Sequence, residues 1–320
     1  MANLAIFSAD NLEGQQLLEA LSDLEPAPQS LRLYSAAAYD AEPAMYRGRP
    51  LDFRPLEDAD YTAIDIAVFM PGQSLGDCVE AAELAGCRVL DAADVLAQRG
   101  DVPVYGAGGE LPLDARSIAI ADAVSSHIAL VLRLLPAVRR VDVAVAQPVS
   151  VAGKEGVDAL AAESARLLNG QALESSALAA QIAFNVLPIP AAKSAEIEHN
   201  LGALLAADGV RPQVNCQAVM AAVFYGHCAM LRAEFDEPLK LGDCRTALLG
   251  DARFRVLLGE GEELASPAGL KGSETIDIAE LALDRRSDNV LRCTLVADNL
   301  RKGVVLNIIE LLKILIKNDI

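Results

Sequence analysis

The chain has 320 residues, of which 52% are hydrophobic, so it can bury a sizeable core in one large domain or, as we expect, in two. Its 45 acidic residues against 27 basic ones give a net charge of −18, which argues against nucleic acid and membrane surfaces as partners, since both require a basic patch. The six cysteines form no CxxC pair and the chain has only three histidines, so we predict no metal site and reduced thiols in a cytoplasmic protein.

Strand-like and helix-like runs alternate from the N-terminus to residue 121. The strand-like runs are almost continuously apolar, which is typical of a parallel sheet covered by helices on both faces. This order predicts an α/β domain with a Rossmann-like, doubly wound parallel sheet. The expected strands are residues 4–8, 31–35, 65–70, 87–92, 102–106 and 117–121.

The pattern changes after residue 122. A helix over 125–138, a strand over 139–150 and an amphipathic helix over 153–170 are followed by longer, strand-rich segments. We therefore expect an α+β domain with a mostly antiparallel sheet. Charged residues interrupt the apolar run at 302–317, so this run predicts an amphipathic helix that packs on a domain and does not span a membrane.

Four stretches in the second half of the chain carry a family resemblance. They are "QPVSVAGKEGVDALAAESARLLNG" (147–170), "FNVLP" (184–188), "AAVFYGHCAML" (221–231) and "ADNLRKGVVLN" (297–307). In order and spacing they resemble the aspartate-semialdehyde dehydrogenase family, and the strand–helix order before them also fits.

The resemblance implies an organisation and a chemistry. Residues 1–122 plus 300–320 would form a Rossmann-like, NAD-binding type domain, and residues 123–299 a dimerisation domain, so we expect a homodimer. Enzymes of the family form a thioester on a cysteine, reduce an acyl phosphate with NADPH and use a histidine as acid and base.

The family's catalytic positions are only partly kept. Alignment with the family places Ser125 at the nucleophilic cysteine and His227, in "FYGHC", at the acid/base histidine, and Gln147 matches a glutamine that contacts the reacting group. A serine hydroxyl is far less acidic than a thiol, so helix N-capping is the alternative role for Ser125. Cys228 adjoins the histidine without matching the nucleophile position, and a Ser125–His127 contact is a further alternative.

The positions around substrate and nicotinamide also differ from the family. Met220 stands where the family places the arginine that binds the substrate carboxylate, and Lys193 and Glu196 correspond only weakly to its substrate motif. Val151 replaces a glycine that lies against the nicotinamide. Asn299, in "DNLRKG", matches a loop on the nicotinamide side, and its alternative role is to join the two domains.

The turn after the first strand lacks a phosphate cradle. The family's Gly-Ala-Thr-Gly-x-Val-Gly motif aligns with residues 8–14, where Ser8 and Asn11 replace glycines and Gly14 remains. The first two glycines would allow the tight turn and the approach of a pyrophosphate. Asp10 and Glu13 add negative charge there, and no arginine follows the second strand for the 2′-phosphate of NADP.

These losses affect separate steps of the family's reaction. Our first hypothesis is a non-catalytic, bacterial, homodimeric paralogue similar to the family's Usg-type proteins, with no cofactor and with an unknown protein partner as one option. The alternative is a divergent NADP- or NAD-dependent semialdehyde dehydrogenase of amino-acid biosynthesis, using Ser125 or Cys228. A third option is a cleft that binds another small molecule through His227 and Gln147.

Overall fold

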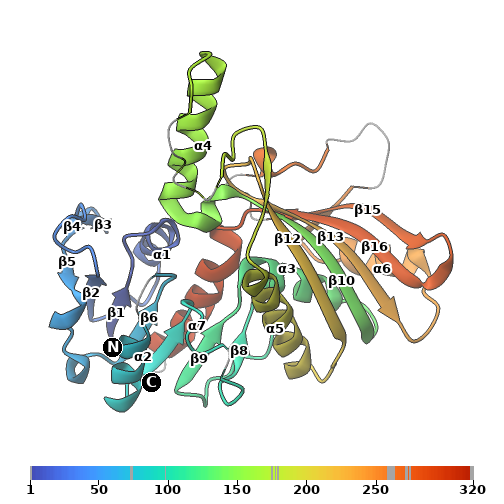
Figure 1. Ribbon diagram of the computed structural model, residues 1–320. Coiled ribbons are helices and arrows are strands. Elements are labelled where there is room, and N and C mark those ends of the chain that lie inside the picture. Colours follow the sequence, from blue (N-terminus) through green and yellow to red (C-terminus); the bar gives the residue numbers. More distant parts are fainter. Residues whose placement is uncertain are drawn as a thin grey trace. The chain divides into compact units, whose positions relative to one another are not determined.

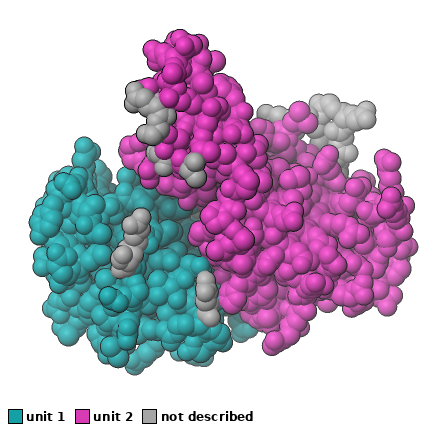
Figure 2. All heavy atoms as spheres, in the orientation of Figure 1, with its two compact units in different colours: residues 1–122, 300–320 teal, residues 123–299 magenta. Residues whose placement is uncertain are grey.

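The computed structural model describes residues 2–72, 75–97, 99–173, 176, 178, 180–257, 264–270, 273 and 275–317. The chain divides into two compact units (Figure 1; Figure 2). Unit 1 contains residues 1–122 and 300–320, and unit 2 contains residues 123–299. Among the described residues, no helix is long and apolar enough to cross a membrane.

Unit 1 is built on a sheet of seven strands whose neighbours all run parallel. This confirms the predicted doubly wound sheet. The strand order is β5-β2-β1-β6-β7-β9-β8. The strands are β1 Asn3–Phe7, β2 Ser30–Ser35, β5 Phe53–Pro55, β6 Ile66–Phe69, β7 Arg88–Asp91, β8 Val104–Tyr105 and β9 Ser117–Ile120.

Helices cover both faces of this sheet. Successive residues of a strand therefore enter two different cores, one on each face. In β1, Leu4 and Ile6 join one core together with α1 (Leu12–Ser22) and α7 (Leu306–Lys317). Ala5 and Phe7 join the other core together with α2 (Gly76–Leu84). A small hairpin, β3 Ala44–Tyr46 and β4 Arg49–Leu51, and two short 3-10 turns, Leu56–Asp58 and Tyr61–Ala63, complete the region between β2 and β6.

Unit 2 holds a second sheet of seven strands, in the order β11-β12-β10-β13-β16-β15-β14. It is mixed: β12 runs parallel to β10 and β14 parallel to β15, and the other four neighbouring pairs are antiparallel. The strands are β10 Val138–Gln147, β11 Val186–Pro188, β12 Gln213–Ala221, β13 His227–Phe235, β14 Phe254–Val256, β15 Ile276–Asp284 and β16 Ser287–Ala297. The helices are α3 Ala123–Leu132, α4 Gly153–Leu168, α5 Ala191–Ala207 and α6 Leu241–Leu249, with a 3-10 turn at Val149–Ala152 and another at Pro267–Gly269.

Two expected boundaries are wrong. Helix α3 begins at Ala123, so Ser125 lies within its first turn and is not the N-cap. The helix ends at Leu132, four residues before Pro136, and β10 starts at Val138. The last helix starts at Leu306, after a wider turn at Arg301–Val305 in which Gly303 leaves helical geometry (φ −107°, ψ −110°).

Candidate active site

His227 is the first residue of β13 and has no exposed surface. Its Nε2 lies 3.3 Å from Nδ1 of His127, which is on α3 and is likewise fully buried. The two rings stack with their centroids 5.1 Å apart. Two imidazoles from segments 100 residues apart therefore form a closed pair in the core of unit 2.

The surroundings of His227 favour its neutral form. Burial, and secondarily the neighbouring His127, lower the pKa of His227 well below its ordinary value. Its Nδ1 has no hydrogen-bond partner among the described residues. A general acid/base must exchange protons near its working pH, so a neutral, fully enclosed imidazole is poorly placed for that role.

The candidate nucleophiles are not aligned with this histidine. Ser125 is fully buried on α3, and its Oγ donates to the carbonyl of Ile197 on α5 at 3.2 Å. Cys228 follows His227 on β13, so strand alternation directs its side chain to the opposite face of the sheet. Burial, and secondarily Glu280, raise the pKa of the Cys228 thiol. Within the described part of the chain, the hydrogen-bond partner of His227 is His127 and neither candidate nucleophile.

Gln147 and Met220 are neighbours across the parallel strands β10 and β12. Both are partly buried. Met220 packs against a small apolar cluster that includes Val149, Leu160 and Ile182. At this position the chain has an apolar contact in place of the fork of donors with which an arginine would bind a carboxylate. Lys193, at the start of α5, donates to Glu196 one turn later, so these two residues pair with each other.

Asn299 holds two loops of unit 2 together. Its Oδ1 accepts from the backbone N–H of Gly226 at 2.8 Å, and its Nδ2 donates to Oγ of Ser150 at 3.1 Å. Gly226 has φ +81°, a conformation that favours glycine, and it directly precedes His227. The amide of Asn299 is thus used to fix the turn that leads into β13. The side chains of Arg301 and Lys302, further along the same motif, lie outside the described residues.

The turn between β1 and α1 is stabilised by its own side chains. Asn11 is the N-cap of α1: its Oδ1 accepts from the N–H of Gly14 at 2.6 Å, and its Nδ2 donates to the carbonyl of Pro71. Ser8 adopts φ +58°, which a glycine would adopt without strain. A Cβ on Gly14 would lie 2.4 Å from Cα of Ala9, so this glycine permits the close packing of α1 on the turn.

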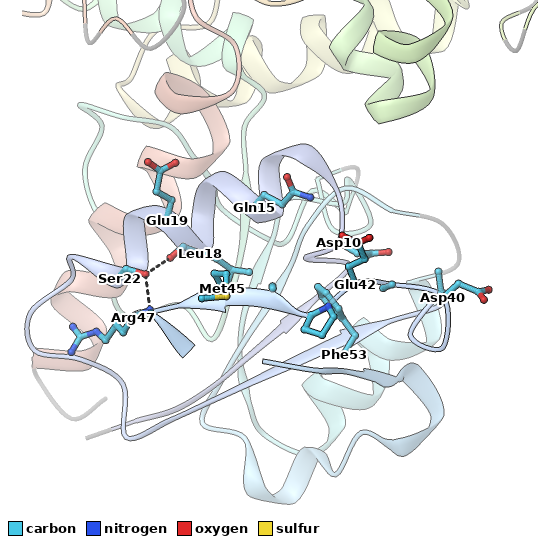
Figure 3. A pocket seen from close by; sticks show the side chains of 15 residues that line it. Asp10, Gln15, Leu18, Glu19, Ser22, Asp40, Glu42, Met45, Arg47 and Phe53 are labelled. Atoms are coloured by element: carbon cyan, nitrogen blue, oxygen red, sulfur yellow. Dashed lines mark hydrogen bonds between the residues drawn. The ribbon is translucent and has the colours of Figure 1, made fainter. Parts of the chain in front are cut away.

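Acidic groups surround this turn. Asp10 accepts a hydrogen bond from Oγ of Ser35, at the end of β2, at 2.7 Å. Burial raises the pKa of the Glu13 carboxyl. A cavity of about 750 Å³ next to the turn is lined by Glu19, Asp40 and Glu42 and by one arginine, Arg47 (Figure 3). An anionic pyrophosphate needs free backbone N–H groups and positive potential, so the residues of this turn do not fit the phosphates of a dinucleotide.

The sequence drew attention to most of these residues but not to the importance of His127. Within the helix predicted there, a histidine two residues after Ser125 carries no motif. Its partner lies 100 residues later in the chain, so only the packing of α3 on the sheet reveals the pair. The described residues contain no group of three or more metal-binding side chains.

Comparison with known proteins finds a matching family model and relatives along nearly the whole chain. A family model described as semialdehyde dehydrogenase, dimerisation domain, matches residues 129–302. The chain is 27% identical to an aspartate-semialdehyde dehydrogenase of Legionella pneumophila, over 98% of this chain and 95% of the relative. It is 26% identical to a USG-1 protein homolog of Pseudomonas aeruginosa, over 99% of this chain and 98% of the relative.

The fold agrees with these matches. The crystal structure of aspartate semialdehyde dehydrogenase II from Vibrio cholerae has a TM-score of 0.88 to this chain at 22% identity, and 100% of both chains is covered. The predicted fold class and the family resemblance are thereby confirmed. The chain belongs to the aspartate-semialdehyde dehydrogenase family.

Proposed function

We propose that this protein is a non-catalytic, homodimeric paralogue within the family, of the Usg type. The observation that carries the proposal is the closed contact between His127 and His227. The family's reaction needs a thiolate beside its acid/base histidine. Here His227 contacts a second imidazole, and the serine aligned with the nucleophile donates to a carbonyl of α5.

The binding positions support the same proposal. Met220 contributes an apolar contact where a carboxylate would need a guanidinium. Asn11 already accepts from the N–H of Gly14 at the N-terminus of α1, and Asp10 adds a carboxylate to that turn. Substrate anchoring and dinucleotide binding would therefore both be lost, while the internal packing of each unit is kept.

Dimerisation is the property that we expect to remain. The matching family model describes a dimerisation domain and covers residues 129–302, which include nearly all of unit 2. Light scattering on the purified chain should give the mass of two chains, and the mass of one chain would contradict this part of the proposal.

Cofactor binding gives the first test. The melting temperature of the full chain should not rise with NADP or NAD up to millimolar concentration. A ligand at 100 times its dissociation constant would add roughly 2.7 kcal/mol of stability, so true binding is easily detected. An active aspartate-semialdehyde dehydrogenase in the same titration is the positive control, and a saturable rise with this chain would favour a divergent dehydrogenase.

The catalytic arrangement gives the second test. The wild-type chain should show no hydride transfer with aspartate semialdehyde, phosphate and NADP. Ser125→Cys should remain inactive, because a thiol there still lacks His227 as a free partner. Hydride transfer by the wild-type chain, or by Ser125→Cys alone, would overturn the proposal.

A further inference from the structure

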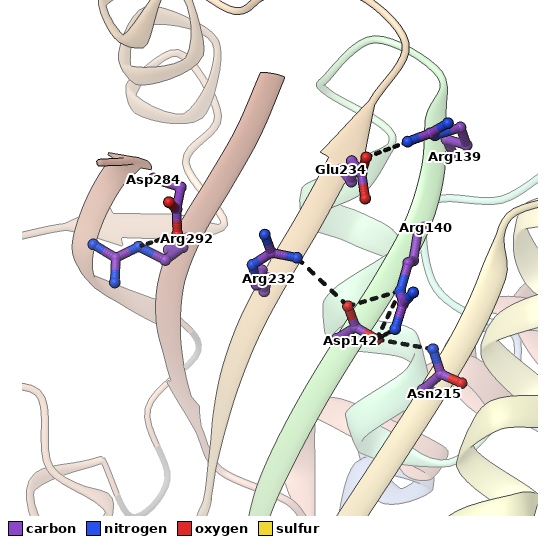
Figure 4. Close-up of polar contacts among 8 residues, drawn as sticks. All are labelled: Arg139, Arg140, Asp142, Asn215, Arg232, Glu234, Asp284 and Arg292. Carbon is purple, nitrogen blue, oxygen red and sulfur yellow. Dashed lines mark hydrogen bonds and ion pairs between the residues drawn. The ribbon is translucent and has the colours of Figure 1, made fainter. Parts of the chain in front are cut away.

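A cavity of about 660 Å³ in unit 2 is lined by three arginines that serve no step discussed so far. Arg232 lies on β13, Arg292 on β16 and Arg245 on α6. Figure 4 shows Arg232 and Arg292 on neighbouring strands. Such a concentration of positive charge is unexpected in a chain whose net charge is −18.

Two of the arginines face an unfavourable neighbour. In the register of the antiparallel pair, Arg232 lies directly opposite Arg292, and like charges in that position destabilise a sheet. Each is in an ion pair that is too long for a hydrogen bond: Arg232 lies 3.7 Å from Asp142, and Arg292 lies 3.7 Å from Asp284. Each guanidinium has five N–H donors, and neither makes a hydrogen bond with the residues that the structure describes, so donors remain for a ligand.

Asp142, the ion-pair partner of Arg232, also accepts shorter hydrogen bonds from two other side chains. Arg140 donates to it at 2.9 Å and Asn215 at 2.8 Å (Figure 4). The hydrogen bond from Arg140 is the main reason why the pKa of Asp142 lies below its ordinary value. Arg232 is therefore a secondary partner of this carboxylate, and it shares the charge of Asp284 with Arg292.

Arg245, the third arginine, has a hydrogen-bond donor that the described residues leave unsatisfied. Its Nε is buried and has no hydrogen-bond partner among the described residues. A buried donor without a partner costs free energy, which an anion entering the cavity would recover. The acidic residue of the lining, Glu280, accepts a hydrogen bond from Thr294 at 3.0 Å.

The remaining lining is apolar and includes Leu257 and Met230. The cavity volume lies in the range typical of small-molecule sites. It is distinct from the His127–His227 pair: Arg232 is five residues from His227 along β13 and on the opposite face, a separation of roughly 17 Å at strand rise.

We propose that this cavity binds a small organic anion carrying two negatively charged groups, a phosphate ester or a dicarboxylate. Arg245 and Arg292 would contact the anionic oxygens, Arg232 would add charge, and Leu257 and Met230 would contact the carbon skeleton. The charged groups of the ligand would relieve the repulsion between Arg232 and Arg292. This inference does not depend on the proposed loss of catalysis.

Calorimetric titration of the full chain tests the proposal, with inorganic pyrophosphate and succinate as probes at low ionic strength. Saturable binding of one ligand per chain is expected. A preference for pyrophosphate would favour a phosphate-bearing ligand, and a preference for succinate a dicarboxylate. Arg245→Gln and Arg292→Gln should each weaken binding at least about tenfold, since a charge-assisted hydrogen bond is lost.

The matched control is Arg211→Gln, which removes an exposed arginine outside the cavity and should leave the affinity unchanged. Arg292 is also exposed, so its variant should fold normally even if Arg245→Gln does not. Three outcomes would overturn the proposal: no saturable heat with either probe, equal weakening by the control, or arginine variants that change the mass of the assembly without changing anion binding.

Discussion

His227 lies in the "FYGH" stretch, and its described contact is a second histidine, which supports the proposed loss of catalysis. In a fully buried pair with His127, neither solvent nor a described nucleophile reaches its Nε2. Burial, and secondarily His127, lower the pKa of His227, so the folded chain favours the neutral ring. At the scale of single residues, the site resembles a packed core more closely than a proton-transfer site.

The pH dependence of stability follows from this state. The pKa of His227 is lowered in the folded chain, so the unfolded chain takes up a proton first as the pH falls. Stability should be complete above about pH 6.5 and decline below it by up to about 1.4 kcal/mol per pH unit. Urea denaturation between pH 5 and 8, as approximate limits, measures this slope.

A variant pair isolates the contribution of His227. His227→Gln should flatten the slope, whereas His199→Gln, which changes an exposed histidine on α5, should retain it. A slope that is equally steep in His227→Gln would assign the effect to other groups.

Asn299 gives a second prediction at this scale. Asn299→Ala removes the acceptor of the Gly226 N–H and a donor to Ser150, all in the interior of unit 2. We expect a loss of about 2 to 3 kcal/mol in the free energy of unfolding, because buried polar groups are left without partners. Asn169→Ala, at the exposed end of α4, should change it by less than about 0.5 kcal/mol. Equal effects of the two substitutions would contradict a structural role for Asn299.

At the scale of elements, the β1–α1 turn has kept what the fold needs. Asn11 caps the helix and Gly14 allows the helix to approach Ala9, and both features are useful without any ligand. The presence of Gly14 in the sequence is therefore explained by packing. The same turn lacks the neutral, donor-rich surface that a pyrophosphate requires.

Two glycine substitutions test this interpretation. Gly14→Ala should cost about 2 kcal/mol or more, since the new Cβ meets the backbone of Ala9 at 2.4 Å. Gly202→Ala, inside α5 with nothing within 4 Å of the added Cβ, should stabilise the protein by about 0.5 to 1 kcal/mol. Thermal unfolding followed by circular dichroism compares the two, and a tolerated Gly14→Ala would contradict the packing argument.

At the scale of the whole molecule, the last helix completes a unit that begins at the N-terminus. Residues 300–320 belong to unit 1, although unit 2 lies between them and residue 122 in the sequence. Leu311, Leu312 and Leu315 of α7 enter the same core as Leu4 and Ile6 of β1. Unit 1 therefore depends on the end of the chain for its stability.

Leu312→Ala should lower the stability of unit 1 by about 2 to 5 kcal/mol, because it removes a fully buried side chain and leaves a cavity. Lys313→Ala, exposed on the same helix, should change it by less than about 0.5 kcal/mol. Tyrosine fluorescence reports mainly on unit 1, which holds five of the six tyrosines. If both variants unfolded at the same denaturant concentration, α7 would not be a core element.

The parallel sheet of the first unit could be predicted from the sequence, because continuous apolar runs separated by helices fit few other arrangements. Its motifs also determined the family, since "FYGH" and "DNLRKG" keep their order and spacing. Two features became visible only in the folded chain: the contact between His127 and His227, and the cavity lined by three arginines, Arg232, Arg245 and Arg292. Such contacts join residues far apart in the chain, so they depend on strand register and helix packing, which local patterns do not specify.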